Sequence, residues 1–171
     1  MAFTRELNQG CRELTAKLIA RNARLVLAES CTAGLVAASL ARIPGVSSVL
    51  CGSAVTYRDE TKVGWLGVER RVLREHGAVC AQVARQMVSG ALSRTPEANL
   101  AAAVTGHLGP NAPEGMDGLV FIAVGRRRKT RAAIVVNKNF LTARTRLARQ
   151  QEASLHVVRE LLKTTAKLHA C

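Results

Sequence analysis

The chain has 171 residues, of which 48% are hydrophobic and 22% are charged, a composition that excludes an intrinsically disordered protein. Its length suits one domain with a sizeable core, so we expect a single domain over residues 1–171. The formal net charge of +13 excludes an acidic protein and would attract anions such as a nucleotide or a nucleic acid.

The first part of the chain alternates helix and strand patterns. Apolar residues recur at helical spacing over residues 5–20, and a short apolar run over residues 24–29 fits a buried strand. Helical rhythm returns over residues 32–41. Residues 48–57 then favour a strand with a bulge at Gly52.

The second part continues this alternation. After the polar loop RDETK, the pattern predicts helices over residues 62–66, 69–75, 81–92 and 142–168, and strands over residues 100–105, 118–124 and 131–137. The basic group RRRK, residues 126–129, is interpreted as a hairpin turn, which would make the last two strands antiparallel.

This order of elements indicates an α/β fold in which a mixed sheet lies between helices. Sites in such sheets gather at the strand ends that face the loops. We therefore expect residues 29–34, 57–62 and 105–118 to share one edge.

The stretch ESCTAG, residues 29–34, joins the first strand to the helix that follows it. Ser30 would lie beside the first backbone N–H groups of that helix, which lack partners within it and can bind an anion. A hydroxyl there could attack a carbonyl while the amides hold the oxyanion. The alternative is that Ser30 only caps the helix, and this stretch taken alone favours the cap.

A second stretch, AVTYRDETK, contains the only tyrosine of the chain, Tyr57, and Lys62. A serine is a poor nucleophile without a base, and no G-x-S-x-G elbow is present. A lysine removed from water can lose its proton, and a tyrosine can relay one. The alternative is an ordinary solvated lysine, which is the commoner case in proteins.

A third stretch, VTGHLGP, follows a predicted strand. Gly106 and Gly109 would let the backbone approach a ligand closely, with the Thr105 hydroxyl at the strand end, or would merely permit a tight turn. His107 could act as an acid or base, but lone loop histidines are usually just solvated. No second His or Cys stands at metal-ligand spacing, so we expect no metal.

The five cysteines have no regular spacing and cannot all pair, which favours a reducing cytoplasm. The amino-terminal residues are charged where a secretory signal would be apolar, and no apolar run is long enough to cross a membrane. Aromatic residues make up only 3%, and the basic residues are dispersed, so nucleic-acid binding ranks below binding of a small nucleotide.

Together these stretches resemble the CinA C-terminal domain family of competence/damage-inducible proteins. The matching segments cover most of residues 10–165 and are AESCTAGLVAASLARIPGVSS, GSAVTYRDETKVGWLGV, HGAVCAQVARQMVSGAL, AAAVTGHLGP and DGLVFIAV. The resemblance implies a three-layer α/β/α sandwich and a homo-oligomer. It also implies an amidohydrolase that converts nicotinamide mononucleotide to nicotinate mononucleotide and ammonia without a cofactor.

The resemblance also implies roles for matched residues. Ser30 would be the nucleophile, Lys62 and Tyr57 would handle protons, and Arg144 would meet the phosphate. The other expected substrate-binding positions are Thr32, Gly34, Thr105, Gly106 and Gly109.

Some positions depart from the family pattern. Ala33 replaces a glycine, His107 and Leu108 make the third turn bulkier, NAPEGMD replaces a glycine-rich segment, and FLTAR lacks the family's glycine and acid beside Arg144. These departures leave an alternative function, a catalytically silent nucleotide-binding domain that acts through a protein partner.

Overall fold

The computed structural model describes residues 2–128 and 132–166. In chain order the elements are α1 (Ala2–Ala20), β1 (Leu25–Glu29), α2 (Leu35–Ala41), the 3-10 turn η1 (Val46–Ser48), β2 (Leu50–Val55), α3 (Asp59–Leu66), α4 (Arg70–His76), α5 (Ala81–Arg94), β3 (Leu100–Gly106), β4 (Leu119–Arg126), β5 (Ala133–Phe140) and α6 (Arg146–Ala166).

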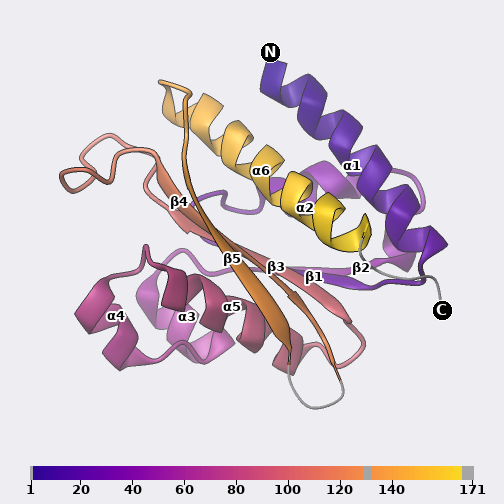
Figure 1. Cartoon of the computed structure of the whole chain (residues 1–171), viewed down its shortest axis with the longest axis horizontal. Coiled ribbons are helices and arrows are strands. Elements are labelled where there is room, and N and C mark those ends of the chain that lie inside the picture. Colours follow the sequence, from indigo (N-terminus) through magenta and orange to yellow (C-terminus); the bar gives the residue numbers. More distant parts are fainter. Residues whose placement is uncertain (1, 129–131, 167–171) are drawn as a thin grey trace.

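The strands form one five-stranded sheet in the order β2-β1-β3-β4-β5. β1 pairs in parallel with both β2 and β3, whereas β4 is antiparallel to β3 and to β5. Helices α1, α2 and α6 cover one face, and α3, α4 and α5 cover the other (Figure 1). The predicted α/β sandwich with a mixed central sheet is therefore confirmed.

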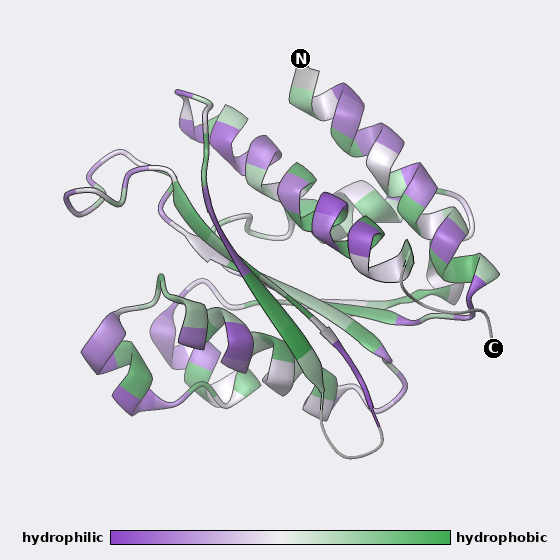
Figure 2. Cartoon of the chain, viewed as in Figure 1, coloured by the Kyte–Doolittle hydropathy of each residue, from purple (hydrophilic) through white to green (hydrophobic). Residues whose placement is uncertain are grey.

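Successive side chains of the strands contribute alternately to two separate hydrophobic cores. Leu25 and Leu27 of β1 pack toward α1, α2 and α6, while Val26 and Ala28 pack toward α5. In Figure 2 the green, hydrophobic colour runs along the strands of the sheet and the helix faces turned toward it. Because successive side chains of a strand point to opposite faces of the sheet, one short apolar run contributes to both cores.

Close backbone packing fixes the second layer of helices. A Cβ at Gly90 of α5 would lie 1.9 Å from the carbonyl oxygen of Leu66, at the end of α3. The absence of a side chain at this position therefore sets how closely α3 and α5 approach. The same α3 carries Trp65, which is 54% exposed.

Several predicted boundaries shift in the structure. Helix α2 begins at Leu35, not at residue 32, because Ala33 and Gly34 adopt positive φ angles of 52° and 93° and form a turn. Helix α3 already begins at Asp59, so most of the predicted RDETK loop is the first turn of a helix. Helix α6 begins at Arg146, four residues after its predicted start, and β5 ends at Phe140, three residues after its predicted end.

Other expectations are met or lie outside the described residues. The pairing of β1 with β2 shifts register between Leu50 and Gly52, which is the predicted bulge. The antiparallel β4–β5 pair is confirmed. Lys129 of the predicted RRRK turn, the start of the last strand at residue 131 and the helix end at residues 167–168 lie outside the described residues. In the part of the chain that the structure describes, no helix combines the length and apolar character that crossing a membrane requires.

Candidate functional site

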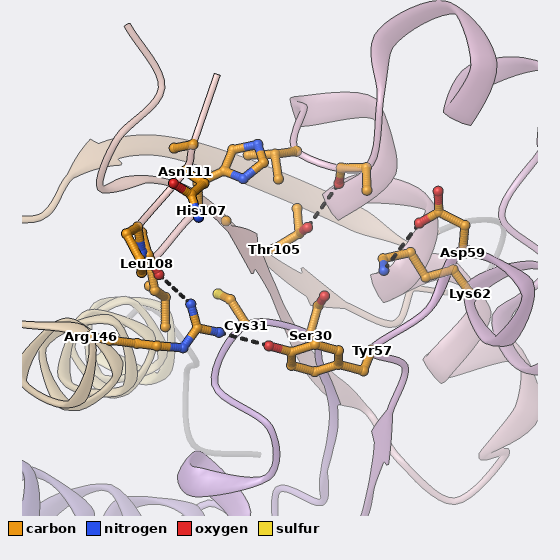
Figure 3. A pocket seen from close by; sticks show the side chains of 16 residues that line it. Ser30, Cys31, Tyr57, Asp59, Lys62, Thr105, His107, Leu108, Asn111 and Arg146 are labelled. Atoms are coloured by element: carbon orange, nitrogen blue, oxygen red, sulfur yellow. Dashed lines mark hydrogen bonds and ion pairs between the residues drawn. The ribbon is translucent and has the colours of Figure 1, made fainter. Parts of the chain in front are cut away.

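A pocket of about 230 Å³ lies at the edge where the parallel strands β1, β2 and β3 end. Its walls come from the residues after β1, the segment from Tyr57 into α3, the residues before α5, the loop after β3 and the first turn of α6. Figure 3 shows side chains from these distant segments meeting around one space. The expected convergence of three loops at one sheet edge is thus observed.

Six of the predicted site residues line this pocket. They are Ser30, Tyr57, Lys62, Thr105, Gly106 and Gly109, and His107 lines it as well. Their roles in binding or chemistry stay predictions, but the chain does bring them to one place.

The turn that carries Ser30 is built around the carboxylate of Glu29. This side chain is 1% exposed and accepts hydrogen bonds from the backbone N–H groups of Gly34, Val36 and Ala37 at 3.0–3.1 Å. The hydroxyls of Thr32 and Ser53 also donate to it, at 2.8 and 3.1 Å. The amides at the start of α2 are therefore satisfied by Glu29, and Ser30 neither caps that helix nor faces its free amides.

The Ser30 backbone is fixed while its hydroxyl stays available. Its N–H donates to the carbonyl oxygen of Val104 in β3 at 3.1 Å, and its carbonyl accepts from Ala33 at 3.0 Å. The residue is 8% exposed and lines the pocket. Among the described residues, the hydroxyl has no hydrogen-bond partner, so a ligand can meet it without breaking an existing contact.

Cys31 places a second nucleophilic atom in the same pocket wall. Burial raises the pKa of its thiol to about 12, an effect that Glu29 reinforces. The thiol therefore stays protonated at neutral pH and is a weak nucleophile. Burial therefore removes the thiolate, which is the usual advantage of a cysteine over a serine as an attacking group.

Lys62 enters the pocket from α3 and is 1% exposed. Its ammonium nitrogen donates to the carbonyl oxygen of Thr56 at 3.1 Å and lies 3.6 Å from a carboxylate oxygen of Asp59. Burial lowers the pKa of Lys62, and the nearby Asp59 opposes that shift. The predicted desolvated lysine is therefore observed, and it has the character of an amine that can accept a proton.

Arg146 lies at the rim of the pocket beside Tyr57. It donates to the Tyr57 hydroxyl oxygen at 2.8 Å and to the carbonyl oxygen of Gly109. Both partners are neutral, and within the described chain no carboxylate pairs with Arg146. Its positive charge is thus available to an anionic ligand.

The end of β3 and the loop after it form another wall of the pocket and leave little room for side chains. A Cβ at Gly106 would lie 2.4 Å from Val120 Cγ1, so this position has no room for a side chain. Gly109 has a φ of 64°, which favours glycine. The Thr105 hydroxyl donates to the carbonyl oxygen of Ala78 at 2.8 Å, so toward a ligand it can only accept.

Two acidic residues hold the loops that deliver these side chains. Asp117 accepts two hydrogen bonds from Arg149 at 2.6–2.7 Å, which lower the pKa of Asp117 and join the loop after β3 to α6. Buried Glu152 accepts bonds at 2.8–3.0 Å from Thr142 and Ala143 in the turn before α6. Burial alone would raise the pKa of Glu152, but these hydrogen bonds outweigh it and lower the pKa.

Three predicted substrate contacts lie outside the pocket lining. Thr32 is fully buried and bonded to Glu29, and the Gly34 amide is bonded to the same carboxylate. Arg144 is exposed in the turn before α6 and does not line the pocket. Residues 144–149, RTRLAR, contain three arginines, and their pattern alone does not show that Arg146, not Arg144, lies at the rim.

Within the described residues, no group of three or more His, Cys, Asp or Glu side chains gathers as a metal-ligand set. The chemistry that the pocket itself supplies is a hydroxyl, a buried amine, a phenol and a guanidinium, from Ser30, Lys62, Tyr57 and Arg146. This set can attack a carbonyl, move protons and bind an anion.

These features define a mixed-sheet α/β protein whose candidate site is built by loops at the ends of its parallel strands. The family model of the CinA C-terminal domain matches residues 8–165, and the chain belongs to this family.

Solved structures agree with this assignment. A competence/damage inducible protein from Agrobacterium tumefaciens is similar with a TM-score of 0.87 and 31% identity, over 95% of this chain and 96% of that one. A CinA superfamily protein from Klebsiella pneumoniae gives a TM-score of 0.86 and 28% identity, over 94% of this chain and 98% of that one.

Curated relatives carry names of the same family. A competence-damage inducible protein of Clostridioides difficile is 38% identical over 85% of this chain, and a CinA-like protein of Geobacter metallireducens is 47% identical over 58%. The chain spans 33% and 24% of the lengths of these two relatives.

Proposed function

We propose that the protein is an amidohydrolase that removes ammonia from the carboxamide of nicotinamide mononucleotide. The observation that carries the proposal is the placement of an unbonded hydroxyl, Ser30, and a buried amine, Lys62, in one pocket. Burial lowers the pKa of Lys62, so a larger fraction of this amine is neutral at neutral pH. The family resemblance supplies the substrate.

The reaction begins with attack by Ser30 on the carboxamide carbon. Neutral Lys62 takes the hydroxyl proton, and the C=O bond opens to a tetrahedral oxyanion. The C–N bond then breaks as the proton passes from Lys62 to the nitrogen, and ammonia leaves. Water adds to the remaining Ser30 ester, giving nicotinate mononucleotide and the free hydroxyl. The Tyr57 hydroxyl, which accepts from Arg146, keeps its own proton to donate to the substrate.

The substrate phosphate would bind at Arg146. The cavity of about 230 Å³ is smaller than the about 300–1,000 Å³ that enclose a whole drug-sized ligand. Only the pyridine ring and carboxamide would therefore enter it, and the ribose phosphate would lie toward the rim. Arg146 is the cation at that rim.

The direct test is ammonia release from nicotinamide mononucleotide by the purified protein. Ser30→Ala and Lys62→Met should each lower kcat at least about 1,000-fold, because each removes a reacting group. Ser47→Ala, at an exposed serine of η1, is the matched control and should keep the parent rate. Full activity of Ser30→Ala would refute the assignment of Ser30 as the nucleophile. An inactive parent protein at high concentration would refute the proposed amidase activity.

A second prediction separates the two candidate phosphate ligands. Arg146→Ala should raise KM for nicotinamide mononucleotide about 10- to 100-fold, as expected from a lost hydrogen bond to a charged group of about 1.5–3 kcal/mol. It should not raise KM for nicotinamide riboside, which lacks the phosphate and carries only the positive charge of its pyridinium ring. Arg144→Ala is the control. If Arg144→Ala raised KM and Arg146→Ala did not, Arg144 would be the phosphate ligand.

The alternative of a silent nucleotide-binding domain predicts calorimetric binding of the mononucleotide without turnover. Cytoplasmic localisation, a single domain over residues 1–171 and homo-oligomerisation stay predictions alongside the proposed activity.

A further inference from the structure

Glu29 is a buried charged group for which the proposed mechanism has no use. Its carboxylate accepts five hydrogen bonds, three from backbone amides and two from hydroxyls. These donors come from the turn after β1, from the start of α2 and from Ser53 in β2. Capping the start of a helix requires only bonds to backbone amides, so the two hydroxyl bonds go beyond what a helix cap requires.

The bonded segment is the one that carries the pocket serine. Ser30 follows Glu29 directly, and the chain then folds back through the positive-φ residues Ala33 and Gly34 to reach the carboxylate. The carbonyl of Glu29 itself accepts from the Thr56 amide at 2.8 Å, next to Tyr57. Main-chain and side-chain atoms of Glu29 therefore tie together the two segments that supply Ser30 and Tyr57.

The amides bonded to Glu29 do not belong to the pocket wall, since Gly34, Val36 and Ala37 do not line the pocket. The role of Glu29 is therefore to hold the turn that carries Ser30. An incoming anion is expected to meet Arg146, which does line the pocket.

We infer that Glu29 is a positioning residue of the site: by anchoring the turn after β1, it fixes the Ser30 hydroxyl against the bound amide. This inference rests on the proposed amidase for its kinetic consequence. Its structural consequence, a turn held by one carboxylate, does not depend on that activity.

The kinetic test compares Glu29→Gln with Glu160→Gln. Both replace a carboxylate that accepts side-chain hydrogen bonds, but Glu160 accepts from Asn137 and Lys163 and does not line the pocket. Because a displacement of about 1 Å at a reacting group costs about 100-fold, we expect Glu29→Gln to lower kcat by about that factor. KM for nicotinamide mononucleotide should change less than about threefold, and Glu160→Gln should keep kcat within about twofold. Parent kcat in folded Glu29→Gln would overturn the inference.

A readout without turnover tests the same residue. Iodoacetamide should modify Cys31 slowly in the parent protein, because this thiol is 6% exposed, and faster in Glu29→Gln, where the turn loses its anchor. Amide hydrogen exchange at residues 34–37 should accelerate in parallel, and neither should change in Glu160→Gln. If the parent releases no ammonia, the amidase fails, yet unchanged modification and exchange in Glu29→Gln would still overturn the role of Glu29.

Two milder variants cover the case in which Glu29→Gln does not fold. Thr32→Val and Ser53→Ala each remove one donor to the carboxylate and keep its charge. Each should lower kcat by a smaller factor with unchanged KM and speed Cys31 modification. Parent values of kcat and of Cys31 modification in both variants would count against the inference.

Discussion

At the scale of single residues, the protonation of Lys62 decides whether the site can act as a base. Burial pushes the pKa of this amine down, and Asp59 pushes it up. The Asp59 side chain is 56% exposed, so water screens its effect, whereas the burial of Lys62 is nearly complete. We therefore expect Asp59 to adjust the pKa of Lys62, and with it the pH range of activity, without being required for activity.

The corresponding prediction concerns Asp59→Asn. Below its pKa Lys62 is protonated and cannot accept the Ser30 proton, so kcat should rise with pH through that pKa. Removing Asp59 takes away the interaction that raises this pKa, so the rising limb should move to lower pH. A pH–rate profile measures the shift, with Glu60→Gln as the neighbouring control. A limb that stays in place or moves to higher pH would show that Lys62 is not the base.

At the scale of elements, periodicity predicted which segments are helices and strands, and it placed the starts of α5 and β3 correctly, but it did not predict where α2, α3 and α6 begin. The start of α2 depends on Glu29, which lies outside the helix, and the turn before α6 depends on Glu152, which lies two turns inside it. Local sequence patterns contain no signal for such contacts. The same turn places Arg146 beside Tyr57, whereas the family resemblance implied Arg144 as the phosphate ligand.

Helix packing gives a prediction at this scale. Gly90→Ala would bring a methyl group within 1.9 Å of the Leu66 carbonyl oxygen, and overpacking of this kind costs about 1–3 kcal/mol of stability. Gly64→Ala in α3, where a Cβ meets nothing within 4 Å, should instead stabilise the protein by about 0.5–1 kcal/mol. Chemical denaturation measures both. Equal effects of the two variants would contradict the close approach of α5 to α3.

At the scale of the whole molecule, the positive charge was evident from composition, but its distribution over the site was not. Arg149 near the pocket is paired with Asp117, while Arg146 has only neutral partners among the described residues. The convergence of Ser30, Tyr57 and Lys62 followed from the rule that strand ends share an edge. Pairing of individual charges depends on loop conformation, which that rule does not include.

The net charge of +13 predicts a dependence on ionic strength. Added salt screens the attraction between the protein and an anionic substrate, so KM for nicotinamide mononucleotide should rise with salt concentration. KM for nicotinamide riboside, a cation that lacks the phosphate, should not rise with salt. Steady-state kinetics over a salt series checks both, and parallel changes for the two substrates would exclude electrostatic attraction as the cause.

The position of Trp65 has a practical consequence. It is the only tryptophan of the chain, it is 54% exposed, and it lies on the same short helix as Lys62. Indole emission from this protein therefore originates at one known point close to the lysine. Quenching by iodide or acrylamide consequently monitors that helix in the native protein, without any attached label.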